Sequence, residues 1–110
     1  MKNVINKVTL TGNAGTEVQI KNFTEKQKLA RVSLAVNEYY KNIKGEPVKR
    51  THWFQLVFWN EHADRALDTI KKGTRLTVEG RLQSLSYQTK KGLKKQVTEI
   101  VVQTMQAISN

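Results

Sequence analysis

The 110-residue chain has room for one domain, spanning residues 1–110, and its 38% hydrophobic and 25% charged residues are ordinary for a small β-rich soluble domain. Nineteen Lys and Arg against nine Asp and Glu leave a net charge of +10, which favours a polyanionic partner and puts nucleic acid ahead of an anionic membrane. The sequence contains no apolar run near spanning length, no signal-peptide core and no cysteine, which excludes disulfides and thiolate chemistry and favours a cytoplasmic protein.

Alternating polar and apolar residues predict three strands in the first half of the chain, over residues 3–11, 28–38 and 51–59. The first of them, over residues 3–11, ends at a predicted turn over residues 12–15, where two glycines flank Asn13 and Ala14. A short extended piece is expected at residues 17–21. A polar loop over residues 41–49, which holds the only proline, separates the second strand from the third.

The second half is predicted to hold one helix and two strands. Asn60 is expected to cap the helix, which stops at Gly73 and has apolar residues at helical spacing. These are Ala63, Ala66, Leu67 and Ile70. Residues 74–88 predict a long strand bent or bulged at Gly80, and a turn over residues 89–92 leads to a final strand ending at Ile108. The inward residues of the long strand are expected to be Leu76, Val78 and Leu82.

This element order predicts an all-β fold with one helix. Three strands, a helix and two strands form the order of the five-stranded OB-fold barrel, with the helix between strands 3 and 4. A different all-β barrel shares the pattern, but the single helix at this point favours the OB fold. The open face of that barrel binds oligonucleotides.

The strand over residues 51–59 has two different faces. Its even positions, from His52 through Phe58, predict a core face, whereas Trp53 and Trp59 share the other face with polar Thr51 and Gln55. The two indoles lie about 20 Å apart at ~3.3 Å per residue. Since every base has a π-face, two such platforms in a basic domain suit a single-strand binder. The alternative is that both tryptophans are buried in a second core layer or a subunit contact.

Two predicted loops combine aromatic and basic residues. Tyr39 and Tyr40 open the first loop, and Tyr87 precedes the second. The loop cations expected to neutralise phosphates are Lys41, Lys44, Lys49, Arg50, Lys90 and Lys91. A solvated charged hairpin tip is the alternative, so these cations are assigned as a group.

No residue pattern predicts catalysis, a metal or a cofactor. His52 and His62 do not form a metal-binding spacing, and the acidic residues form no paired-carboxylate motif. The glycines of residues 12–15 match neither a dinucleotide-binding motif nor a P-loop. We therefore expect a non-enzymatic protein with no catalytic residue, no bound metal and no cofactor.

Several short motifs, in order, give the chain a resemblance to the bacterial-type single-stranded DNA-binding proteins over residues 4–105. They are Asn6-Lys7-Val8 with Gly12-Asn13-Ala14-Gly15, Leu34-Ala35-Val36-Asn37-Glu38, Thr51-His52-Trp53, Lys71-Lys72-Gly73, Val78-Glu79-Gly80-Arg81-Leu82 and Thr98-Glu99-Ile100-Val101-Val102. The resemblance implies an OB fold and sequence-independent binding of single-stranded DNA in replication, recombination or repair. It also implies a homotetramer, as a dimer of dimers, in a bacterial cytoplasm in association with the nucleoid.

The family's base-stacking aromatics fall on Tyr40, Trp53, Trp59 and Tyr87, and two positions that are often basic fall on Lys7 and Lys72. Arg75 completes the expected phosphate-binding set. The chain departs from the family at Gln55 and Glu61, which replace commonly basic residues, and at Phe54, where a histidine near the subunit interface is common. Leu85-Ser86 also stands where Arg and Lys are common. Because the sequence ends without the family's acidic tail, tail-mediated recruitment of other proteins is not expected.

Three other hypotheses stay open at the level of sequence. A primosomal protein of the same fold would bind single strands as a dimer in replication restart. An RNA-binding OB protein is the second, although nothing in the sequence is suited to recognising a 2′-hydroxyl. A small nuclease or deaminase is the third, and it would need a metal or paired acids.

Overall fold

The computed structural model describes residues 5–22 and 24–108, so the start of the strand predicted over residues 3–11 lies outside the described residues. The elements are β1 (Val8–Ala14), β2 (Gln19–Asn22), β3 (Lys28–Lys41), β4 (Pro47–Trp59), α1 (Glu61–Thr69), β5 (Arg75–Gln88) and β6 (Lys94–Ala107). No helix in this part of the chain has the length and apolar character needed to cross a membrane.

The strands form a closed barrel. They follow the order β1-β5-β6-β4-β3-β2, and β1 also pairs with β3, which joins the two ends of the sheet. The predicted all-β fold with five long strands and one helix is confirmed. The extended piece expected at residues 17–21 forms the short strand β2, paired along β3, so the helix follows the fourth strand by count.

The core lies inside the barrel and under α1. Even-numbered residues of β3 and β4 point inward as predicted, with Leu34, Leu56 and Phe58 fully buried. Phe54 packs at the edge of this core. His52 was expected on the core face, but its side chain is partly exposed and lies 3.7 Å from a Glu38 carboxylate oxygen. The core ends at this level: Val36, the cross-strand partner of His52, packs at its margin, and the residues of β3 beyond Val36 are exposed.

The turn predicted over residues 12–15 is wrong, because β1 continues through Ala14. Asn13 pairs with Arg75 on one side and Ala35 on the other, at the point where β1 closes the barrel. A Cβ on Gly12 would lie 2.3 Å from the Ala35 carbonyl oxygen. Gly12 therefore allows two strands to approach closely, and the local signal for a turn was misleading.

The bend predicted at Gly80 is confirmed. The β5–β6 register shifts between Glu79 and Gly80, and a Cβ on Gly80 would lie 2.0 Å from the Val101 carbonyl oxygen. Leu76 and Val78, before the bend, are buried as predicted. Leu82, after it, is exposed, so its inward assignment is wrong. Beyond the bend the strand leaves the barrel.

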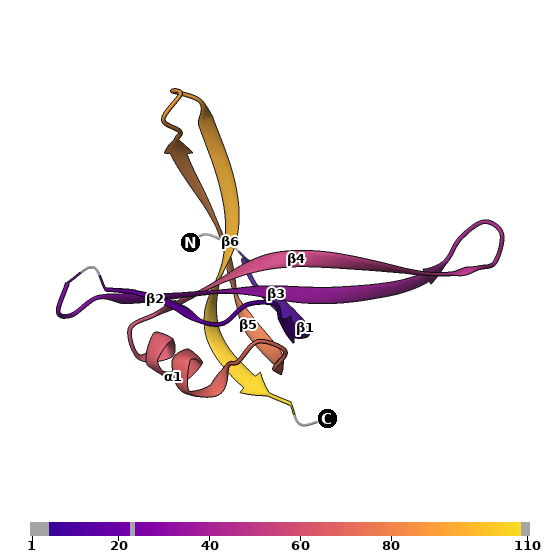
Figure 1. Cartoon of the computed structure of the whole chain (residues 1–110), viewed down its shortest axis with the longest axis horizontal. Coiled ribbons are helices and arrows are strands. Elements are labelled where there is room, and N and C mark those ends of the chain that lie inside the picture. Colours follow the sequence, from indigo (N-terminus) through magenta and orange to yellow (C-terminus); the bar gives the residue numbers. More distant parts are fainter. Residues whose placement is uncertain (1–4, 23, 109–110) are drawn as a thin grey trace.

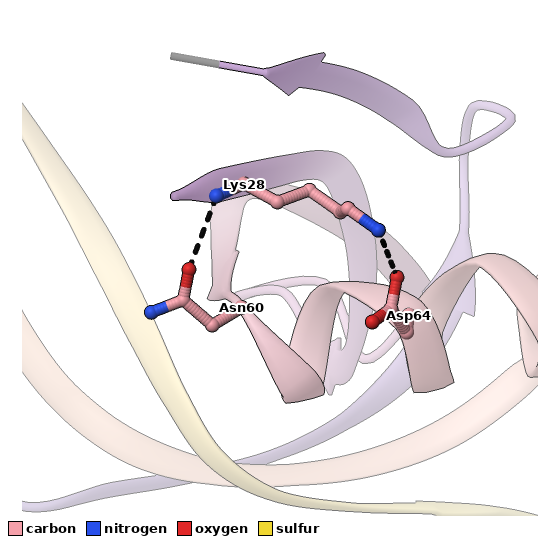
Figure 2. Close-up of polar contacts among 3 residues, drawn as sticks. All are labelled: Lys28, Asn60 and Asp64. Atoms are coloured by element: carbon pink, nitrogen blue, oxygen red, sulfur yellow. Dashed lines mark hydrogen bonds and ion pairs between the residues drawn. The ribbon is translucent and has the colours of Figure 1, made fainter. Parts of the chain in front are cut away.

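Asn60 precedes α1 as predicted, but its side chain does not cap the helix. Its φ is 54°, and its Oδ1 accepts a 3.0 Å hydrogen bond from the backbone N–H of Lys28 (Figure 2). The Lys28 ammonium in turn forms an ion pair with Asp64 in the first helical turn. The strand-to-helix turn is thus fixed to the start of β3. Leu67, predicted on the apolar face, is exposed, and the buried face consists of Ala63 and Ala66 with Ile70 following the helix.

Two long hairpins project from the barrel in different directions (Figure 1). The β3–β4 ladder continues unbroken from Leu29 opposite Trp59 to Lys41 opposite Pro47. The predicted loop over residues 41–49 is therefore shorter than expected, because residues 41 and 47–49 belong to the strands. In the remaining turn the Asn42 side chain accepts hydrogen bonds from the backbone N–H groups of Lys44 and Glu46. The β5–β6 hairpin consists of the parts of the two strands that lie beyond the Gly80 bend, and it turns at residues 89–93.

Candidate nucleic-acid interface

Both tryptophans lie on one face of the β3–β4 ladder. Trp53 stands opposite Ala35 and Trp59 opposite Leu29, and side chains alternate in between. Trp53 is 62% exposed, so burial of both indoles is wrong within a single chain. Trp59 is only partly exposed. Val57, which alternation also assigns to this face, is fully buried.

The Trp53 indole is held in place by the chain that follows β1. Because its cross-strand neighbour Ala35 is small, the ring reaches over β3 to Gly15, and a Cβ at that glycine would lie 2.3 Å from Cζ3 of Trp53. Gly15 is itself fixed by a 2.8 Å hydrogen bond from its N–H to the Ser33 carbonyl. The exposed ring thus has one fixed edge and an accessible face.

An ion pair crosses the same face between the two tryptophans. Arg31 on β3 donates from Nε to Oε2 of Glu99 on β6 at 3.1 Å, passing over the intervening strand β4. This cover explains why Val57 is buried on the outside of the barrel. Arg31 was not among the predicted site residues, because its contact with Glu99 joins positions 68 apart in the sequence.

Tyr40 lies on the other face of the β3–β4 hairpin. It stands opposite Val48, whereas Tyr39 stands opposite Lys49 on the face that carries Trp53. The Arg50 guanidinium lies 5.4 Å from the centre of the Tyr40 ring and donates to its hydroxyl at 3.3 Å. Tyr40 is 39% exposed and Tyr39 is 72% exposed. The structure therefore separates Tyr40 from the tryptophans, although all three belong to the same hairpin.

Tyr87 belongs to the second hairpin. It is half exposed and stands opposite Lys95 on β6, so an aromatic ring and an ammonium lie side by side on this arm. The four predicted aromatics thus lie on three parts of the surface: Trp53 and Trp59 on one face of the β3–β4 ladder, Tyr40 on its other face, and Tyr87 on the β5–β6 hairpin.

The nine predicted phosphate-binding residues are all exposed. Lys41, Lys44, Lys49 and Arg50 surround the end of the first hairpin, and Lys90 and Lys91 occupy the tip of the second. Lys72 and Arg75 lie where the chain enters β5, and Arg75 borders a polar hollow of about 220 Å³ together with Tyr39. Lys7 lies 3.6 Å from a Glu79 carboxylate oxygen, which partly neutralises it.

Within residues 5–22 and 24–108, no three His, Cys, Asp or Glu side chains are grouped so that they could hold a metal ion. Three hollows along the strands are open surface depressions, beside β2, beside Arg75 and on the second hairpin. The exposed aromatic rings and cations of this surface can offer stacking and electrostatic attraction.

The model of the single-strand binding protein family matches residues 5–108. Similar curated proteins include "Single-stranded DNA-binding protein 1" of Chlorobaculum tepidum, 36% identical over 105 residues, covering 94% of this chain and 65% of that protein. A "Single-stranded DNA-binding protein" of Streptococcus mutans is 31% identical, covering 97% and 64% respectively. That of Xanthomonas campestris is 35% identical, covering 94% and 60%. The chain thus spans somewhat less than two thirds of the length of these three relatives.

Among solved structures, the Plasmodium falciparum SSB complex with ssDNA is similar, with a TM-score of 0.88 and 28% sequence identity. The match covers 99% of both chains. The closed barrel and its projecting hairpins are therefore shared with a protein whose structure was solved with a single strand bound.

Proposed function

This chain belongs to the single-strand binding protein family, and we propose that it binds and protects single-stranded DNA without sequence preference, as one OB domain over residues 1–110. The observation that carries the proposal is the exposed indole of Trp53, held at one edge by Gly15 on a protein with a net charge of +10. A fixed aromatic face stacks on any base, and surrounding cations attract the phosphate backbone.

Within this proposal, Tyr40, Trp53, Trp59 and Tyr87 stack on bases, and the exposed lysines and arginines of the hairpins and of the β5 entrance neutralise phosphates. Because these groups are spread over two arms that point in different directions, a bound strand would have to bend around the barrel (Figure 1). The protein would act by coating DNA in replication, recombination or repair, without catalysing a reaction. Assembly as a homotetramer and action in a bacterial cytoplasm belong to the same proposal.

The proposal is tested by titrating the protein with oligo-dT at two salt concentrations and following tryptophan fluorescence, with duplex DNA and RNA of the same length as comparisons. We expect quenching on stacking and an affinity that falls linearly on a log–log plot against salt. Fluorescence that stays flat through saturation would contradict stacking on Trp53 and Trp59. Equal affinity for duplex DNA would contradict the preference for single strands.

A further inference from the structure

The Arg31–Glu99 ion pair occupies the part of the barrel wall that separates the two tryptophans. Arg31 stands opposite Val57 on β4. This pair is two residues along the strands from the Leu29–Trp59 pair and four residues from the Ala35–Trp53 pair. At ~3.3 Å per residue along the strands, the base of its side chain is about 7 Å from the level of Trp59 and about 13 Å from that of Trp53. A strand stacked on both indoles would carry its backbone past Arg31.

Glu99 is a buried carboxylate with one partnered and one unpartnered oxygen. Its side chain is only 5% exposed, and its Oε1 has no hydrogen-bond partner among the described residues. Burying a carboxylate in this way is unfavourable, and a buried ion pair often adds little net stability over apolar residues of similar volume. The buried charge is better explained by what it does to Arg31, whose side chain is 40% exposed.

The contact with Glu99 uses one edge of the guanidinium group. Arg31 donates from Nε to Glu99, and its two terminal NH₂ groups form no hydrogen bond with a described residue. A guanidinium has five N–H donors in a rigid planar fork, which matches the geometry of a phosphate. Fixing Nε therefore orients the two terminal NH₂ groups without occupying them. Arg31 also borders an open hollow of about 270 Å³ beside β2, together with Leu29 and Lys21.

We infer that Arg31 is a phosphate-binding residue between the two tryptophans, and that Glu99 is the positioning residue that orients it. This inference rests on the proposed function and extends its site to a part of the barrel wall that contains no other predicted cation. The ligand is one phosphodiester of the single strand, held by the guanidinium between two stacked bases.

The test measures the affinity of oligo-dT over a series of salt concentrations for Arg31→Gln and Glu99→Gln. Arg65→Gln is the matched control, since it removes the same charge from an exposed residue of α1. We expect Arg31→Gln to weaken binding roughly tenfold, as for loss of a charged hydrogen bond, and to lower the salt slope by about one. Arg65→Gln should stay within about twofold of the unmodified protein, because it alters only the general field.

Glu99→Gln distinguishes orientation from simple charge. The change raises the net charge by one, so a purely electrostatic account predicts tighter binding. We expect weaker binding, by roughly threefold or more, because the amide oxygen of Gln accepts a weaker hydrogen bond than a carboxylate and orients the guanidinium less firmly. If Glu99→Gln does not fold, Arg31→Lys takes its place: the ammonium keeps the charge but lacks the fork, and we expect it to lose most of the affinity that Arg31→Gln loses.

Arg31→Gln with the affinity and salt slope of Arg65→Gln would overturn the phosphate contact. A folded Glu99→Gln that binds as tightly as the unmodified protein or more tightly, or Arg31→Lys at full affinity, would overturn the positioning role. These outcomes differ from failure of the proposed function, in which the unmodified protein itself does not bind oligo-dT.

Discussion

The ring edge of Trp53 rests on the backbone of Gly15, closely enough that a Cβ at that position would come within 2.3 Å of Cζ3. An exposed indole normally samples several rotamers, and ordering it on a ligand costs free energy. Here Gly15 and the small cross-strand neighbour Ala35 leave room for the ring, so that it occupies one position in the unbound protein. The position of this stacking surface therefore depends on a residue that contributes no side chain.

Gly15→Ala should consequently displace Trp53 and weaken oligo-dT binding without unfolding the barrel. In a Trp59→Phe background, where Trp53 is the only tryptophan, we expect the emission of the free protein to shift and the affinity to fall by about 1 kcal/mol, as for partial loss of stacking. The matched control is Gly15→Ala in a Trp53→Phe background, where Trp59 emission should not change. An unshifted Trp53 spectrum with full affinity would show that the contact does not position the ring.

Trp53→Ala should weaken binding by about 1–3 kcal/mol while the protein keeps its stability, because the indole is mostly exposed. Trp59→Ala should reduce the free energy of unfolding more, since Trp59 is partly buried beside Leu29. Chemical denaturation and oligo-dT titration of both variants separate the two effects. A Trp53→Ala variant that aggregates would mean that this residue supports the fold.

The two neighbouring tyrosines of β3 offer a test of which face of the hairpin meets DNA. We expect Tyr40→Ala to weaken binding more than Tyr39→Ala, because Arg50 holds the Tyr40 ring and adds a cation beside it. Both changes remove one exposed tyrosine, so each is the control for the other in the same oligo-dT titration. The opposite ranking would place the strand along the face of Trp53 out to Tyr39 and Lys49.

The tip of the second hairpin should contribute through charge alone. Replacing Lys90 and Lys91 together by Gln should lower the magnitude of the slope of log affinity against log salt by about 1.5. The reason is that each neutralised phosphate of a single strand contributes ~0.7 to that slope. The control replaces two exposed cations away from both hairpin tips, Lys26 and Arg65, and its slope should barely change. Equal slopes for the two double variants would remove the tip from the binding surface.

Gly80→Ala should destabilise the protein by about 1–3 kcal/mol, as overpacking does, because the added Cβ meets the backbone of Val101 and not a movable side chain. Urea denaturation measures the change. Ser86→Ala, on the exposed arm of the same strand, is the control and should alter stability by no more than about 0.5 kcal/mol. A Gly80→Ala variant of normal stability would show that the bend accommodates a side chain.

The period-two patterns and the turn signals predicted the long strands, the helix and the buried residues Leu34, Leu56, Phe58, Leu76 and Val78 correctly, because burial on one face leaves a local trace. The errors fall where distant segments meet. Residues 12–15 look like a turn, yet they close the barrel against β3 and β5. Leu82 has the right parity for the core but lies beyond the Gly80 bend, where the core has ended.

The site residues divide in the same way, into those with a local sequence signal and those placed by contacts between distant segments. Trp53 was recognisable because an aromatic among polar residues on one strand face is unusual, and its exposure agrees with that interpretation. Arg31 was not recognisable, since it looks like any polar residue of an alternating strand and only the pairing of β4 with β6 brings Glu99 within its reach. Which face Tyr40 occupies also depended on the β3–β4 register and could not be derived from its neighbours.

Closure of the barrel by β1 depends on strands that are synthesised much later than β1 itself. β1 pairs with β5, and the Asn6 side chain hydrogen-bonds to the backbone of Leu82 at both its N–H and its carbonyl, across 76 positions. None of these contacts can form until β5 has been synthesised, and the parallel β4–β6 pairing needs a segment made later still. Contacts of such long range slow folding, because the chain must lose the entropy of a large loop before they form. On the ribosome, the β3–β4 hairpin and the short β1–β3 pairing can therefore form before β1 meets its main partner, β5.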